Sequence, residues 1–346
     1  RQLVTRDRCD RCGTTSFEET PKPFVGESGR LLDAILSESG LPRERCFVGN
    51  VRRTPLNEDQ KNLDYCGPVL PRLAIDLEEF APTLVLCLGG LSLSAFGPPR
   101  FEPSPTKWRG SRFQGTLEGV EYECMAALHP AAILREPSQL ALLRFDIARA
   151  VAEAAHPSPP IQRVIDAPTS ADEVVARLRT IQATQTPVGY DLEGNHEGVT
   201  VCSFATSATA ALSIPLRRRN WSHIWSTPDE ERIVRAIGNV LEEAAVKKVA
   251  HNLAFEQFTH RWLYGHQLRS GECSMIGWNV MLPELEKNLS VVASILTRQE
   301  YWGEAGYVSP SNPNGWRNDA DRDTYNAIDS CVCLEAWQRL MAEFTP

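Results

Sequence analysis

Two acidic residues in the second half of the chain have a spacing that can bind metal ions. Asp191 and Glu193 lie in the segment VGYDLEGN, at the end of an apolar run that predicts a strand. Because alternate residues of a strand point to the same face, both carboxylates face the same way. Two such carboxylates repel each other unless a cation neutralises them. Hard oxygen ligands of this kind suit Mg²⁺ or Mn²⁺ better than a soft metal.

Two further segments supply candidate residues for the same site. Asp329 follows Tyr325 by one helical turn in TYNAIDS, and Glu256 follows Asn252 in AHNLAFEQF, at a predicted strand-to-helix junction. Each segment alone also has an ordinary explanation, such as a solvated turn, an amphipathic surface or an acid favoured by the helix dipole. Their order and spacing together favour a common site.

The elements that must position these residues alternate between strands and helices. In the second half, apolar periodicity and capping residues predict a helix at 170–181, strands at 187–192, 200–206 and 209–214, and helices at 228–245, about 253–264 and about 320–344. This order predicts an α/β domain with a mixed sheet.

The first half of the chain predicts a second α/β domain with a parallel or mixed sheet. Its expected elements are helices at 30–39 and 139–155 and strands at 46–51, 82–90 and 122–128. The prolines of AAHPSPPIQR cannot continue a helix, so this pattern predicts a linker at residues 157–163. We therefore expect domains at 1–156 and 164–346, which agrees with about 150 residues per domain.

The composition excludes several classes of protein. The 346 residues carry a net charge of −8, which argues against a protein that coats nucleic acid by bulk electrostatics. No apolar run is long enough for a membrane helix, and the N-terminal segment lacks an apolar signal core. We therefore expect a cytoplasmic protein whose ten cysteines are reduced thiols or metal ligands.

The three acidic segments together resemble a nuclease family. Residues from about 164 to 346 resemble the proofreading 3′→5′ exonuclease domain of family A DNA polymerases, in the superfamily of the RNase D and Werner-type nucleases. The family's Asp-x-Glu motif is matched by Asp191 and Glu193, and its Tyr-x-x-x-Asp motif by Tyr325 and Asp329. Its Asn-x-x-aromatic-Asp motif is matched from Asn252 onward, with Glu256 in place of the aspartate. The stretch 283–297 resembles the region between the last two motifs, especially in bacteriophage polymerases.

This resemblance implies a ribonuclease H-like fold and two-metal hydrolysis of DNA at a single-stranded or frayed 3′ end. Asp191, Glu193, Glu256 and Asp329 would hold two Mg²⁺ or Mn²⁺ ions, and Tyr325 would orient the attacking water. No polymerase domain follows Pro346, so we expect the chain to work with a separate DNA polymerase polypeptide, in a phage and in the host cytoplasm. An RNA-trimming nuclease with the same site is an alternative.

The first half resembles the uracil-DNA glycosylase superfamily, notably its iron–sulfur type. The segments PFVGESGRLLDAIL, CFVGNVRRTP and LHPAAILREP match the family's uracil pocket in order. By this resemblance, Phe24 would stack on a flipped uracil, Asn50 would read its edge and His129 would lie behind it. The candidate cluster ligands are Cys9, Cys12 and Cys66.

Two departures from the glycosylase pattern leave alternatives open. The family's Gly-Glu-x-Pro-Gly motif does not fit between Cys12 and Pro23, so the module is degenerate or that segment is missing from the chain. Thr54 stands where a third cysteine ligand is expected, so a 4Fe-4S cluster and a Zn²⁺ ion are both possible. The module would then bind DNA or polymerase, and the alternatives are a non-catalytic scaffold and an active uracil-DNA glycosylase.

Overall fold

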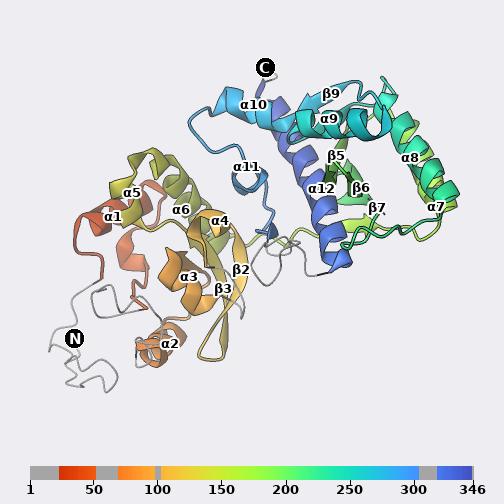
Figure 1. Cartoon of the computed structure of the whole chain (residues 1–346). Coiled ribbons are helices and arrows are strands. Elements are labelled where there is room, and N and C mark those ends of the chain that lie inside the picture. The colour runs from red at the N-terminus through yellow and green to blue at the C-terminus, as the bar shows by residue number, and fades with distance from the viewer. Residues whose placement is uncertain (1–22, 52–68, 98–102, 304–317, 345–346) are drawn as a thin grey trace. The chain divides into compact units, whose positions relative to one another are not determined.

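The computed structural model describes residues 23–51, 69–97, 103–303 and 318–344. The chain divides into two compact units, residues 1–159 and 160–346, whose helices and strands are labelled in Figure 1. Among the described residues, no helix is both long and apolar enough to cross a bilayer.

The first unit packs helices around a small mixed sheet. Strand β3 lies in the centre, parallel to β1 and antiparallel to β2. Four consecutive residues of β3, from Cys124 to Ala127, are fully buried, as expected for a strand covered on both faces. The elements are α1 (Glu27–Glu38), η1 (Arg43–Arg45), α2 (Val69–Phe80), β1 (Val85–Leu88), α3 (Gly90–Phe96), α4 (Pro105–Trp108), β2 (Arg112–Leu117), β3 (Val120–Ala127), α5 (Pro130–Arg135), η4 (Pro137–Gln139) and α6 (Leu140–Ala155).

The β2–β3 hairpin was not expected from the sequence. Its two-residue turn is formed by Glu118 and Gly119, which both have positive φ angles, 48° and 86°. Such a turn matches the twist of a hairpin, and a glycine accepts this backbone conformation without strain. The Glu-Gly pair between two alternating segments was the available signal.

The strand predicted at 46–51 is wrong. After η1, the residues from Cys46 to Val51 are irregular, and no strand in the described part of the chain pairs with them. A short apolar run becomes a strand only when a neighbouring backbone accepts its hydrogen bonds, and the Gly49-Asn50 pair weakens any such tendency.

The second unit is built on a six-stranded sheet of order β4-β7-β6-β5-β8-β9. Strand β6 is antiparallel to both neighbours, whereas β5, β8 and β9 are parallel to one another. The elements are β4 (Val164–Asp166), α7 (Ala171–Gln182), β5 (Val188–Asn195), β6 (Gly198–Ser207), β7 (Ala210–Pro215), α8 (Thr227–Glu242), β8 (Lys248–Ala250), α9 (Leu253–Tyr264), β9 (Gly271–Cys273), α10 (Ser274–Met281), α11 (Leu289–Leu296) and α12 (Asp319–Phe344).

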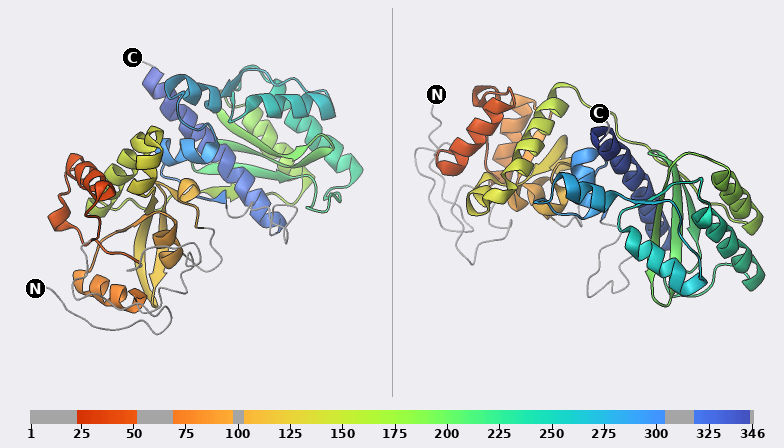
Figure 2. Two further views of the ribbon diagram at one scale, coloured as in Figure 1. Left: turned by 60° about the vertical axis from the view of Figure 1, so that its left-hand side comes forward. Right: turned by 90° about the horizontal axis from the view of Figure 1, so that it is seen from above.

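Helices cover both faces of this sheet (Figure 2). Helices α7 and α8 pack on one face, where Val174 and Ile237 join a core with Tyr190 and Phe204 of the sheet. The long helix α12 packs on the other face against β5, β6 and β7. The mixed sheet and its helices confirm the predicted α/β fold class.

Candidate functional site

Strand β5 places Asp191 and Glu193 side by side, as the sequence predicted. Both side chains point to the α12 face of the sheet, whereas Tyr190 and Leu192 enter the core on the other face. Gly189 lies two residues before Asp191 on the same face. A Cβ atom at Gly189 would lie 2.1 Å from the backbone oxygen of Ser330, so only glycine lets α12 approach β5 this closely.

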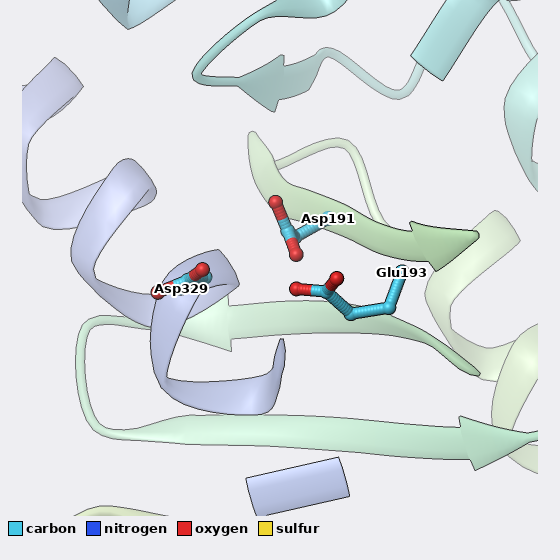
Figure 3. A group of neighbouring side chains, drawn as sticks. All are labelled: Asp191, Glu193 and Asp329. Carbon is cyan, nitrogen blue, oxygen red and sulfur yellow. The ribbon is translucent and has the colours of Figure 1, made fainter. Parts of the chain in front are cut away.

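That close approach brings Asp329 of α12 to the two acids of β5. One carboxylate oxygen from each of Asp191, Glu193 and Asp329 lies within 4.8 Å of the others. Figure 3 shows the Asp191 and Glu193 carboxylates from β5 next to Asp329 on its helix. We call these three residues the acidic cluster. Asp329 therefore meets two residues that lie 136 or more positions earlier in the sequence.

Glu256, in the first turn of α9, lies outside this group of three, although it is near enough for its charge to raise the pKa of Asp191. It is buried, and its Oε2 atom has no hydrogen-bond partner among the described residues. Burial raises the pKa of Glu256 to about 8, and the charge of Glu193 adds to this rise. A backbone hydrogen bond to the carboxylate opposes this rise, but a buried carboxylate oxygen without a partner is costly unless a cation or a proton neutralises it.

Three neutral side chains hold the acids in place. Asn326 Nδ2 donates to Asp191 Oδ2 at 2.6 Å, and Trp302 Nε1 donates to Asp329 Oδ1 at 2.5 Å. Tyr325, on the same helix face one turn before Asp329, also hydrogen-bonds to it. The sequence reasoning missed Asn326, although it lies three residues before Asp329, and missed Trp302, which comes from a loop with no local signal.

The electrostatics of the acidic cluster favour bound cations. Burial, followed by the charges of neighbouring acids, raises the pKa of Asp191 well above its usual range. Burial and the charge of Glu193 do the same for Asp329, against the opposing hydrogen bonds from Trp302 and Tyr325. Burial raises the pKa of Glu193 to about 7. The cluster thus binds protons tightly, as closely spaced carboxylates do when no cation is present.

The donor set fits hard divalent cations. The three acids of the acidic cluster, like Glu256 near them, offer only carboxylate oxygens, which are the ligands that Mg²⁺ and Mn²⁺ prefer. The unpaired Oε2 atom of Glu256 supplies a buried acceptor that a cation would satisfy. The residues of this site therefore fit the metal ions that the sequence predicted.

A second contact ties the helix of Glu256 to the strand of Asp191. The Tyr190 hydroxyl hydrogen-bonds to Nε2 of His260, which lies one turn after Glu256 on the buried face of α9. Burial lowers the pKa of His260 to about 3, so the ring is neutral in the folded chain. This contact fixes the distance between the two elements that carry the acids.

The first unit brings Phe24 and His129 together. Their rings stack with centroids 5.3 Å apart and planes at 22°. Nδ1 of His129 accepts a hydrogen bond from the backbone of Ala131 at the start of α5, and burial lowers its pKa. A Cβ atom at Gly89 would lie 2.9 Å from Cβ of His129, so the glycine after β1 makes room for the imidazole.

Asn50 lines the same cavity as Phe24 and His129. Asn50 is exposed. It lies in the irregular segment after η1 and not in a strand. The three predicted pocket residues thus share one hollow, whose other walls include Phe47, Leu88 and Ser92. The candidate cluster ligands Cys9, Cys12 and Cys66, as well as Thr54, lie outside the described residues.

Comparison with solved structures gives distant similarity over about half of the chain. The Aedes aegypti Nibbler EXO domain is 14% identical, with 52% of this chain and 88% of that chain covered and a TM-score of 0.39. Brucella melitensis NrnC bound to pGG is 13% identical, with 54% and 81% covered and a TM-score of 0.32.

Comparison of the sequence identifies the first unit. A model of the uracil DNA glycosylase superfamily matches residues 13–154. The type-4 uracil-DNA glycosylase of Pyrobaculum aerophilum is 32% identical over 136 residues, which are 38% of this chain and 69% of that protein. That of Archaeoglobus fulgidus is 32% identical over 123 residues, 34% of this chain and 60% of that protein. Through its first unit, the chain belongs to the uracil DNA glycosylase superfamily.

Proposed function

We propose that the second unit is a metal-dependent 3′→5′ exonuclease that removes nucleotides from DNA ends. The observation that carries this proposal is the convergence of Asp191, Glu193 and Asp329 within 4.8 Å, with the buried Glu256 beside them. The direction of hydrolysis rests on the order of the three sequence motifs, which resembles that of the proofreading domain of family A DNA polymerases.

The four acids would hold two Mg²⁺ or Mn²⁺ ions. When bound, these ions stabilise the negative charge that develops during phosphodiester hydrolysis. The charge of Asp329, together with burial, raises the pKa of Tyr325, so its hydroxyl stays protonated and can orient a water molecule. Asn326 and Trp302 hold the Asp191 and Asp329 carboxylates, which keeps their free oxygens pointed into the site.

A hydrolysis assay tests the proposal. The full chain is incubated with a 5′-labelled single-stranded DNA oligonucleotide in Mn²⁺, and the products are separated by length. We expect a ladder of products shortened from the 3′ end, which a chelator abolishes. Asp191→Ala should reduce the rate by at least 10³-fold, whereas Glu231→Ala, an exposed acid on α8, should leave it unchanged. A full-length substrate after long incubation would refute the proposal, and the scaffold alternative would then stand.

The substrate and partner of this site are finer proposals. An RNA oligonucleotide of the same sequence separates DNA proofreading from RNA trimming, because the better substrate should be cut faster by the same four acids. The proofreading role would place the chain beside a DNA polymerase, as the motif order suggests. Gel filtration with the cognate polymerase should give a complex that elutes earlier than either protein.

We propose a second function, uracil recognition, for the first unit. Membership in the glycosylase superfamily and the shared cavity of Phe24, Asn50 and His129 support it. An aromatic ring can stack on an extruded base, and an amide can pair with its edge. The matched segment spans 60–69% of the length of the two relatives, so excision by the whole chain is a proposal.

Uracil-containing DNA tests this second function. Active excision would leave alkali-labile sites at uracil, and Asn50→Ala should abolish them. Binding without excision would instead give a preference for uracil-containing DNA and no strand breaks after alkali, which is the expected result for a degenerate module. Metal analysis and visible absorption of the purified chain would show whether a 4Fe-4S cluster or Zn²⁺ is present, with Cys9, Cys12 and Cys66 as proposed ligands.

A further inference from the structure

Helix α9 exposes a stripe of aromatic side chains that no part of the proposed mechanism uses. Phe255, Phe258 and Trp262 are 38%, 61% and 67% exposed. At about 100° per residue, the spacing of three and four residues places them on one side of the helix. We call these three residues the aromatic stripe. Large exposed aromatic groups that lie together are unusual on a soluble surface and mark a binding site.

The aromatic stripe begins at the candidate active site. Phe255 immediately precedes Glu256, whose side chain enters the site from the buried side of the same helix. From Phe255 to Trp262 the helix rises about 10 Å. Glu256 faces the acids from the buried side of α9, whereas Phe258 and Trp262 lie on the outer side of the same helix. A nucleic-acid strand that leaves the acids past Phe255 can continue along that outer side.

The chemistry of the stripe suits unpaired bases. The Phe258 and Trp262 rings are 6.2 Å apart between centroids and nearly parallel, with 10° between their planes. Bases of any sequence can stack on such faces. Arg261 is exposed on the same helix beside the stripe; its Nη1 donates to the backbone oxygen of Gly265 at 2.9 Å, and its other N–H groups can contact a phosphate. Helix α10 provides a contrast, because its exposed Ile276 and Val280 offer neither flat faces nor a cation.

We propose that the aromatic stripe binds the single-stranded nucleic acid upstream of the end held in the acidic site. This inference rests on the proposed nuclease function for its substrate class. It adds a binding surface for nucleotides that are not being cleaved. The expected consequence is that affinity depends on strand length, because a short oligonucleotide reaches the acids but not the stripe.

Fluorescence anisotropy of labelled oligothymidylates tests the inference on the full chain, with Ca²⁺ in place of Mg²⁺ to slow hydrolysis. Oligonucleotides of about 15 and about 3 nucleotides are compared, within and below the range of common single-strand sites. The double variant Phe258→Ala, Trp262→Ala should bind the long strand at least about fivefold more weakly. It should bind the short strand as the unaltered chain does. The matched control Ile276→Ala, Val280→Ala should bind both normally.

A conservative variant separates stacking from folding. Trp262→Phe keeps an aromatic face, so it should bind the long strand nearly as well as the unaltered chain. It should also show less fluorescence quenching by the long strand, because the quenched indole is gone. Equal long-strand binding by the double variant would overturn the inference. The inference would also be overturned if the α10 control weakened long-strand binding equally. If the double variant changed only the sedimentation coefficient of the chain, the stripe would instead be a contact between two copies of the chain.

The two proposals can fail separately. If Asp191→Ala leaves nucleotide release unchanged while long-strand binding still depends on Phe258 and Trp262, the nuclease assignment fails and the stripe remains a binding surface. If nucleotide release depends on Asp191 and long-strand binding ignores the stripe, the inference fails and the nuclease assignment stands.

Discussion

Replacing Glu256 by glutamine should stabilise the metal-free chain at alkaline pH. Burial raises the pKa of Glu256 from 4.5 to about 8 in the folded chain. The folded chain therefore holds this proton more tightly than the unfolded chain does. Its contribution to stability is greatest below about pH 4.5 and is lost as the pH rises through about 8. Gln has the same shape and no charge, so Glu256→Gln removes this dependence.

The size of the effect follows from the pKa. A rise from 4.5 to about 8 corresponds to about 4 kcal/mol of unfolding free energy at pH 8, at 1.36 kcal/mol per pKa unit. For a unit of this size, that is a rise in Tm of about 10 °C. At pH 4.5 the difference should be within about 1 kcal/mol.

Thermal and urea unfolding in a chelator, at pH 4.5 and pH 8, measures this difference. Added Mn²⁺ should reverse the difference in stability between the two chains. The Glu256 carboxylate is a metal ligand and the glutamine amide is a weak one, so the unaltered chain should gain more stability from the metal. Glu231→Gln, at an exposed position on α8, is the matched control and should behave as the unaltered chain at both pH values. If the glutamine variant is no more stable at pH 8, or is stabilised equally at both pH values, the argument that the buried charge of Glu256 governs this site is refuted.

Three other substitutions test the supports of the acidic cluster. Trp302→Phe removes the hydrogen bond to Asp329, so the Mn²⁺ affinity measured by calorimetry should fall about 10-fold or more. Unchanged affinity would contradict the proposal that Trp302 holds the Asp329 carboxylate in place. Gly189→Ala places a methyl group 2.1 Å from a backbone oxygen of α12. The free energy of unfolding should therefore fall by at least about 3 kcal/mol, and stabilisation by added metal should disappear. A normal urea midpoint would show that α12 can move away freely. Tyr190→Phe leaves His260 without its hydroxyl partner and should destabilise the chain by about 1–2 kcal/mol in urea unfolding, whereas no change would mean that the contact does not hold α9 in place.

Much of the second unit could be predicted from local patterns. The helix expected at about 253–264 is α9, and the helix expected at 170–181 is α7, with Ser170 as its cap. These helices carry strong local signals, since the Ser170 side chain accepts from the backbone of Glu173 and Gly265 ends α9 in a left-handed conformation. The short strands β4, β8 and β9 were missed, because three residues carry no periodic signal and depend on their neighbours.

The sequence by itself determined which side chains could do chemistry. The alternation of β5 puts Asp191 and Glu193 on one face, and the helical period aligns Tyr325 with Asp329, because both rules act over a few residues. Only the tertiary structure decided that Asp329 reaches the β5 acids. That approach depends on the missing side chain at Gly189 and on packing between segments far apart in the sequence. The same holds for the Trp302 hydrogen bond and for the burial of Glu256, because no local pattern records which distant group will lie against a side chain.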